Sequence, residues 1–171
     1  MAGLDMEFAI GGDLDAALTR AIAAATDLTP VMMDIAGHLA DETRARFDSE
    51  RDPMGVPWKK SRRAQEEGGQ TLTDSGDLRG SIREDWGKDF AAAGPERSGG
   101  AAIYAAIHQW GGTIFPRTAG ALKFGGRLVS RVVMPKRSYL GWTEDDDEYA
   151  LQALGDHIAA AFGGSAGGAT K

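Results

Sequence analysis

Apolar residues recur at helical spacing in two stretches near the start of the chain. The first stretch runs from Leu14 to Ala25, and the second begins after the Thr29-Pro30 pair. A capping hydroxyl followed by proline is typical of a helix start, because the N–H that proline lacks has no helical partner there. The pattern therefore predicts a long helix from about Pro30 to Phe47, which we expect to be the spine of the core.

The helical pattern stops before residues 49–70, where no apolar periodicity is visible. Turn-forming residues lie between Asp52 and Trp58, and the basic run Lys59-Lys60-Ser61-Arg62-Arg63 follows them. A connection of this length without regular structure is usually functional or disordered. We therefore predict a loop over residues 49–70.

Shorter elements are predicted in the second half of the chain, where capping side chains precede apolar runs and glycines mark turns. In chain order they are a capped helix at 74–82, strands at 83–86 and 90–93, a helix from Tyr104 to Gly111, a hairpin within 119–134 and a final helix capped by Thr143.

These elements predict an α+β fold, in which a small and mostly antiparallel sheet packs against the long helix and two further helices. At 171 residues the chain is long enough for one core, so we expect a single domain over residues 1–162. The small and polar residues 163–171 predict a disordered tail.

Composition narrows the class of protein. The chain has 42% hydrophobic and 26% charged residues, no cysteine and a formal net charge of −6. No apolar run approaches the roughly 20 residues that a membrane-spanning helix needs, and we expect neither a membrane partner nor a secretion signal. Without cysteine there is no disulfide and no thiolate chemistry. The negative charge argues against bulk nucleic-acid binding as the main function, although it leaves a local basic patch open.

His108 is the side chain that most resembles a catalytic group, because Tyr104 and Trp110 flank it. A general base needs an orienting carboxylate or a nucleophile within reach, and the sequence contains no nucleophile motif. The other histidines, His38 and His157, match no zinc spacing. We therefore expect His108 to be structural, with both ring nitrogens serving buried backbone groups. The alternative is an enzyme that uses His108, which predicts an activity lost on replacement by Gln.

Two further patterns indicate no ligand site. The acidic run Glu144–Asp147 lacks the spacing and the glycine of a calcium loop, so we expect a solvated helix N-terminus. The glycine pairs at 99-100, 111-112 and 125-126 are not followed by Gly-Lys-Ser/Thr, so they form no phosphate loop. We expect no catalytic residue, no cofactor and no metal.

The basic run beside Trp58 leaves three interpretations open. Its lysines and arginines are suited to contact phosphates while Trp58 stacks on a base, which is the nucleic-acid-binding alternative. The interpretation that we favour is a solvated loop whose tryptophan anchors it to the body of the protein. A third interpretation is a contact with an acidic neighbouring protein.

Four segments, taken in order, resemble the phage virion morphogenesis family, the tail-completion proteins of Mu-like and P2-like phages. They correspond to that family's Pro-x-Gly-x-x-Trp loop, its Thr/Ser-Gly-x-Leu-x-x-Ser segment, its Tyr-Ala-x-x-His-Gln-x-Gly signature and its Arg-Pro-Phe-Leu-Gly segment. In this chain they are residues Asp52–Trp58, Leu72–Ile82, Tyr104–Gly112 and Pro135–Gly141.

The matching positions of these segments are expected to be structural. They are Gly76, Leu78, Ser81, Tyr104, His108, Gln109 and Gly111. The chain departs from the family pattern at Ser138, where proline is common, and the hairpin within 119–134 is interpreted as an elaboration.

The resemblance implies a non-catalytic structural protein that completes the tail and joins it to the head, in the neck or as a tail-terminator ring. Its implied partners are further copies of itself in a hexameric ring and neighbouring neck and tail proteins, with DNA passing through the channel without specific binding. The implied location is the virion, and the host cytoplasm during assembly. Exposed aromatic residues and arginines are enriched at such contacts. The expected interface residues are Trp58, Lys59, Lys60, Arg62, Arg63, Trp110, Arg137 and Tyr139.

Overall fold

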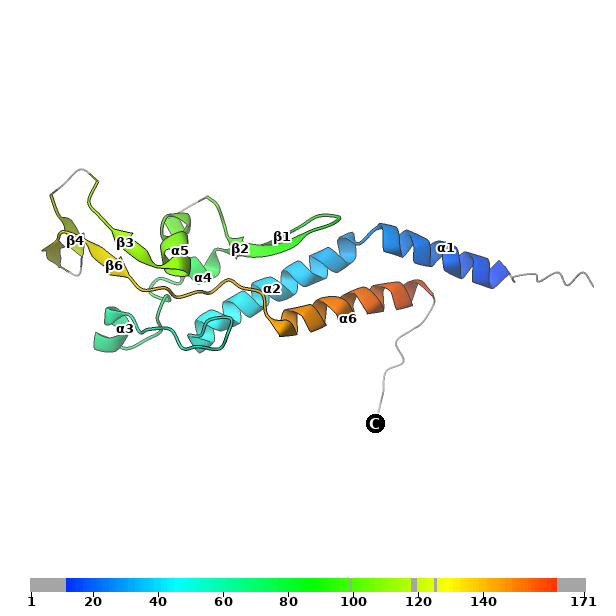
Figure 1. Ribbon diagram of the computed structural model, residues 1–171, viewed down its shortest axis with the longest axis horizontal. Helices are drawn as coiled ribbons and strands as arrows, with labels where there is room; N and C mark the ends of the chain where they lie inside the picture. Colours follow the sequence, from blue (N-terminus) through cyan, green and yellow to red (C-terminus); the bar gives the residue numbers. More distant parts are fainter. Residues whose placement is uncertain (1–11, 99, 118–119, 125, 163–171) are drawn as a thin grey trace, which may run out of the picture.

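The computed structural model describes residues 12–98, 100–117, 120–124 and 126–162. The predicted disordered tail at 163–171 lies outside the described residues. The molecule is elongated, and helix α2 (Thr29–Ser49) runs diagonally through it as its longest element (Figure 1). Helix α1 (Gly12–Thr26) extends the long axis at one end, and helix α6 (Glu144–Ala161) lies beside α2 and contacts α1.

The prediction of a long helix that forms the spine is confirmed, with one correction at its start. Proline occupies the first turn of α2, but Thr29 is not the cap. The N-cap is Leu28, which makes no side-chain cap bond, and the Asp27 carboxylate accepts from the Thr29 N–H at 3.1 Å. At the other end, Glu50 takes a left-handed conformation and its N–H donates to the Arg46 carbonyl, which ends the helix.

The two strands predicted near residues 83–93 form an antiparallel hairpin that packs on α2. Strand β1 (Ile82–Trp86) pairs with β2 (Ala91–Pro95), and the Gly87 N–H donates to the Phe90 carbonyl at 2.9 Å in the turn. Ile82 is fully buried at the start of β1, whereas the rest of that strand is exposed. One face of this hairpin therefore supplies the core.

The described strands do not form one sheet but three two-stranded antiparallel sheets. Strands β4 (Leu122–Phe124) and β5 (Arg127–Val129) form the predicted hairpin. Strand β6 (Val132–Met134) leaves that hairpin and pairs instead with β3 (Gly112–Ile114), directly after helix α5 (Gly100–Trp110). The α+β class is confirmed. The β3–β6 and β4–β5 sheets lie at the end of the molecule opposite α1, and the β1–β2 hairpin lies along α2 in the middle (Figure 1).

Residues 49–70 are more regular than the predicted loop. Asp52 Oδ1 accepts the N–H groups of Met54 and Val56, and Arg51 pairs with Pro57 in an isolated antiparallel bridge. Helix α3 (Arg62–Glu66) follows, because the Ser61 hydroxyl caps it by accepting from the Ala64 N–H at 3.1 Å. The Asp52 carboxylate thus orders the first half of this stretch and the Ser61 hydroxyl orders the second. Neither contact leaves a trace in the spacing of apolar residues.

The main core lies where the C-terminal half of α2 meets β1, α5 and helix α4 (Asp77–Gly80). It contains side chains from each of the four family-like segments, which lie far apart in the sequence. Its buried members are Ala40, Phe47, Trp58, Leu78, Ile82, Ala105 and Tyr139. Among the described residues, no helix has the length and apolar character needed to cross a membrane.

Candidate functional site

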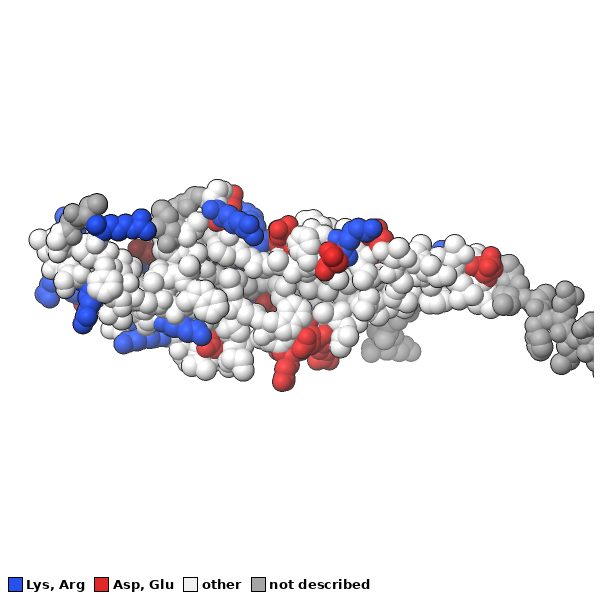
Figure 2. Space-filling view, turned by 45° about the horizontal axis from the view of Figure 1, so that its top comes forward, with Lys and Arg blue, Asp and Glu red and all other residues white. Residues whose placement is uncertain are grey.

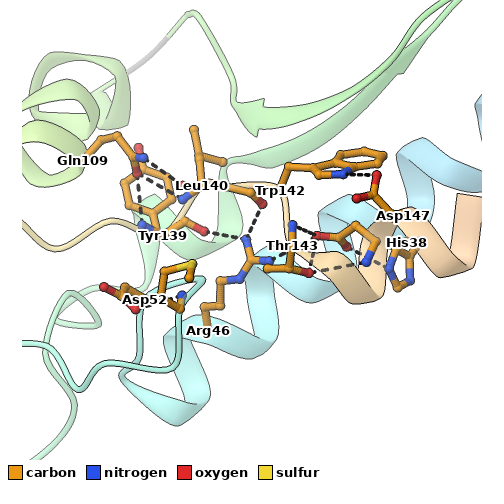
Figure 3. A network of polar contacts seen from close by, with 12 residues as sticks. His38, Arg46, Asp52, Gln109, Tyr139, Leu140, Trp142, Thr143 and Asp147 are labelled. Atoms are coloured by element: carbon orange, nitrogen blue, oxygen red, sulfur yellow. Dashed lines mark hydrogen bonds and ion pairs between the residues drawn. The ribbon is translucent and has the colours of Figure 1, made fainter.

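Residues 135–143, which we call the strap, form an extended segment between β6 and α6 without regular secondary structure. The strap crosses from the C-terminal end of α5 over α2 to the start of α6 (Figure 3). Buried backbone groups need hydrogen-bond partners, and a segment outside a sheet or helix must find them elsewhere. Here most of the partners are side chains from other elements.

Gln109 of α5 satisfies the centre of the strap. Its Oε1 accepts the N–H groups of Tyr139 and Leu140, both at 3.0 Å, and its Nε2 donates to the Leu140 carbonyl at 2.8 Å. Figure 3 shows the amide pointing at these two residues. The side chain therefore binds the strap much as a neighbouring β-strand would, which gives the glutamine of the signature a structural role.

The first part of the strap is bound by the loop that precedes α3. Trp58 Nε1 donates to the Ser138 carbonyl at 2.9 Å, and Arg137 Nε donates to the Lys59 carbonyl at 2.7 Å. The Arg137 N–H also donates to the His108 carbonyl at 2.8 Å, which continues the end of α5. Three of the family-like segments thus meet at this point.

Arg46 of α2 binds the second part of the strap and links it to α6. Its Nη1 donates to the carbonyls of Tyr139 at 3.2 Å and Gly141 at 3.0 Å, and its Nη2 lies 3.8 Å from Asp146 Oδ2. The Asp146 carboxylate also accepts from the N–H and the hydroxyl of Thr143, at 2.8 and 2.7 Å. This closes a capping box that fixes the start of α6.

Asp146 makes a further contact with α2. Its Oδ1 lies 3.0 Å from His38 Nε2, and the imidazole is stacked on the Tyr149 ring at 3.8 Å between centroids. Asp146 is 1% exposed, so the expectation of a solvated acidic helix N-terminus is wrong for this residue. The sequence signal that was missed is the Thr-x-x-Asp spacing from Thr143, which is a capping-box pattern with a shorter acid.

Tyr139 fills the space beneath the strap. Its hydroxyl donates to the Ala105 carbonyl at 3.1 Å, and its ring packs 5.3 Å from that of Phe47 between centroids. Burial raises the pKa of Tyr139 to about 12, because the phenolate would lose its hydration. The residue is therefore neutral at ordinary pH and acts as a packed anchor.

His108 lies beside this network without taking part in it through its ring. Burial lowers the pKa of His108, and the nearby positive charge of Arg137 lowers that pKa further, so the ring is neutral near pH 7. Its Nδ1 is buried and has no hydrogen-bond partner among the described residues. The expectation that both ring nitrogens serve backbone groups is therefore wrong for Nδ1. The Tyr104 ring packs edge-on against the imidazole, with 5.9 Å between the ring centroids.

The glycines of two family-like segments are explained by backbone geometry. Gly111 ends α5 with φ +71, and a Cβ there would lie 2.8 Å from the Lys136 backbone nitrogen. Gly76 has φ +83 and precedes α4, which places Leu78 in the core. The Ser81 hydroxyl donates to the Leu78 carbonyl at 2.8 Å and ties down the end of that helix. In this structure, these residues set the path of the backbone at the end of α5 and around α4.

The eight expected interface residues divide into two groups. Trp58, Arg137 and Tyr139 are 6%, 5% and 1% exposed, so the expectation that these side chains lie at the surface is wrong. Their side chains form hydrogen bonds within the subunit, in the strap or beside it. Trp110 is 72% exposed, and Lys59, Lys60 and Arg62 are also exposed, whereas Arg63 is half-buried. An interface role for these surface residues stays a prediction.

The basic run is largely paired within the chain. Lys60 lies 3.8 Å from Glu50, Arg62 pairs with Glu66 at 2.7 Å and Arg63 pairs with Asp74 at 3.1 Å between nitrogen and oxygen. Trp58 is buried and its indole N–H is used, so it offers no open face for a base to stack on. The described residues contain no group of three or more His, Cys, Asp or Glu arranged to hold a metal ion.

Comparison with known proteins shows the family of the chain. Residues 11–159 match the phage virion morphogenesis family, and the chain belongs to this family. A relative from Escherichia phage Mu, named "Putative capsid assembly protein G", is 32% identical over 139 residues, which cover 75% of this chain and 78% of that protein. No solved structure matches the chain. The protein is therefore a phage virion morphogenesis protein.

Proposed function

We propose that this protein completes the phage tail and joins it to the head, through contacts with further copies of itself and with neighbouring neck and tail proteins. The observation that supports this proposal is the convergence of the four family-like segments on the strap. The polar and aromatic side chains of these segments hold one rigid subunit together. Rigid subunits with exposed aromatic residues are suited to assembly, and no arrangement for acid–base or nucleophilic chemistry surrounds His108 among the described residues.

We further propose a ring of subunits, with a hexamer as the expected form, located in the neck or at the tail terminus of the virion and built in the host cytoplasm. Heterologous contacts close into a ring when the rotation between neighbours closes. A negatively charged chain suits a channel through which DNA passes without specific binding. Residues 1–162 are proposed to unfold as one domain.

A second candidate is capsid assembly, because the Mu relative carries that function in its name. The two candidates predict different defective particles. Electron microscopy of a lysate from a phage or prophage that carries a nonsense mutation in this gene distinguishes them. For head–tail joining we expect filled heads and separate tails; for capsid assembly we expect few or aberrant heads. Normal infectious particles without the protein would overturn both.

A further inference from the structure

Charges are strongly segregated along the second half of the chain. Residues 97–137 contain no Asp or Glu, and residues 138–162 contain no Lys or Arg. Figure 2 shows Lys and Arg gathered over the end of the molecule that carries the small sheets, and a cluster of Asp and Glu over its middle. The cations of the first segment are Arg97, Arg117, Lys123, Arg127, Arg131, Lys136 and Arg137.

The acidic flank, as we name it, comprises seven of the exposed acids of α2, β1 and the first turns of α6. They are Asp34, Asp41, Glu84, Glu144, Asp145, Asp147 and Glu148. The β4–β5 hairpin lies at the far end of the molecule from α6, so the two regions do not neutralise each other within one chain (Figure 1).

A cavity of about 410 Å³ opens on the acidic flank between α2, β1 and α6. Three carboxylates line it, and among the described residues only Arg44 pairs with them, at 2.7 Å from Asp41 and 3.7 Å from Glu84. The rings of Trp86 and Tyr149 form part of its wall. Carboxylates beside aromatic faces are suited to a lysine or arginine side chain.

The β4–β5 hairpin presents the complementary chemistry. Lys123 and Arg127 are exposed on it, next to the exposed apolar side chains of Phe124 and Leu128. A protruding tip that carries both cations and large apolar groups is typical of a protein contact rather than of a solvated turn.

A buried cation, Arg137, lies near the hairpin and does not contribute to its exposed charge. Arg137 lines a cavity of about 540 Å³, together with Phe124 of β4 and His108. It is almost fully buried, yet no carboxylate of the described residues lies within 4.0 Å of its guanidinium nitrogens. Buried charges are normally paired. Asp74 and Asp77 line the same cavity, and Asp74 pairs with Arg63 at 3.1 Å, so the cavity already holds acidic groups of its own.

We propose that the β4–β5 end of one subunit docks on the acidic flank of a second copy. A cationic side chain of the hairpin enters the cavity lined by Asp34 and Glu84. This contact joins two different surfaces, so it can repeat around a ring. The inference rests on the self-association proposed above, and it assigns the surfaces that make the contact.

Charge reversal on each surface tests the contact in the full-length protein. The first variant combines Lys123→Glu with Arg127→Glu, and the second combines Asp34→Lys with Glu84→Lys; all four side chains are exposed. The mass in solution is measured by light scattering after size exclusion, at about 50 mM and about 500 mM NaCl, because salt screens such contacts. We expect the wild type to associate at low salt and each variant to weaken association about tenfold or more.

Mixing the two variants provides the sharpest measurement. Alone, each variant opposes surfaces of like charge, whereas in the mixture the tip of either variant meets a flank of opposite charge on the other. A head-to-tail contact therefore predicts that mixing the two variants restores the association that each lacks alone. The control exchanges Lys123→Arg and Arg127→Lys, which keeps the charge and should associate as the wild type does. Circular dichroism confirms that the variants are folded.

Three results would overturn the inference. They are a wild type that is monomeric at both salt concentrations, charge-reversed variants that associate normally, and a mixture that remains monomeric. Unchanged association together with lost binding to a short DNA duplex would instead make the basic end a nucleic-acid surface. Immunoblots of purified virions separate the two proposals, because a virion protein that fails these tests keeps its proposed function and loses only this contact.

Discussion

The side chain of Gln109 hydrogen-bonds Leu140 in both directions, accepting from its N–H at 3.0 Å and donating to its carbonyl at 2.8 Å. A single side-chain amide thereby replaces the pairing that a second strand would give. This relationship joins the signature of α5 to the strap, and it explains how an irregular segment can cross the core without leaving its backbone groups unsatisfied at this point.

Replacing Gln109 with Ala should destabilise the protein by about 2–3 kcal/mol, because it leaves the N–H groups of Tyr139 and Leu140 without an acceptor. Urea denaturation followed by circular dichroism measures the change in the free energy of unfolding. Gln152→Ala, at an exposed position of α6, is the matched control and should be nearly neutral. Equal stability of the two variants would contradict the role assigned to the amide.

Asp146→Asn should lower the free energy of unfolding by about 3 kcal/mol, because the buried carboxylate serves Thr143, His38 and Arg46 together. The neighbouring Asp145 is exposed, so Asp145→Asn separates the loss of a specific network from the loss of one helix-terminal charge. Thermal unfolding of both variants gives the comparison. A similar loss in the two would mean that the helix dipole, rather than the network, is responsible.

Gly111→Ala should destabilise by about 2 kcal/mol or more, because φ is +71 and the added Cβ meets the Lys136 backbone. Gly155→Ala in α6 meets nothing within 4 Å and should instead raise stability by up to about 1 kcal/mol. The same replacement of glycine by alanine is thus expected to lower the free energy of unfolding at Gly111 and to raise it at Gly155. If Gly111→Ala behaves like Gly155→Ala, the close approach of the strap to α5 is not real.

The stability of the wild type should fall at alkaline pH through Tyr139. The pKa of Tyr139 is about 12 in the folded protein and near its ordinary value of 10.0 in the unfolded chain, so the folded state holds the proton longer. The contribution of the neutral Tyr139 to the free energy of unfolding is complete below pH 10 and is lost as pH rises toward 12. Tyr139→Phe should lose about 1 kcal/mol at neutral pH with its hydrogen bond, and show a shallower alkaline decline in urea midpoints. An unchanged decline would contradict this assignment.

His108 should produce a decline on the acidic side. Because burial and Arg137 lower its pKa in the folded state, the unfolded chain binds a proton first as pH falls. The stabilising contribution is complete above the ordinary pKa of 6.5 and is lost as pH falls through the lower folded value. Comparing urea midpoints of the wild type and His108→Gln between about pH 7.5 and 5.5 checks this. Parallel profiles would show that the ring does not titrate as described.

Local patterns in the sequence determined the elements whose stabilising contacts are close along the chain. The apolar stripe and the proline predict α2, Thr143 predicts the start of α6, and the glycines predict the β4–β5 hairpin, because each signal acts within a few residues. The same patterns predicted one sheet, whereas the strands form separate two-stranded sheets and β6 pairs with β3 across the β4–β5 hairpin. Strand partners depend on the path of the chain, which no local signal contains.

The sequence also showed which residues matter in the second half, but not what they do there. Gln109, Arg137 and Tyr139 stood out by residue type, and surface contact was the natural expectation for the last two. Tertiary structure decided otherwise, because the strap brings α2, α5 and α6 together and its backbone demands buried partners. Arg46 and Asp146 are 100 residues apart and acquire their role only when α2 and α6 lie side by side. Their pairing is a property of the packed helices rather than of either segment.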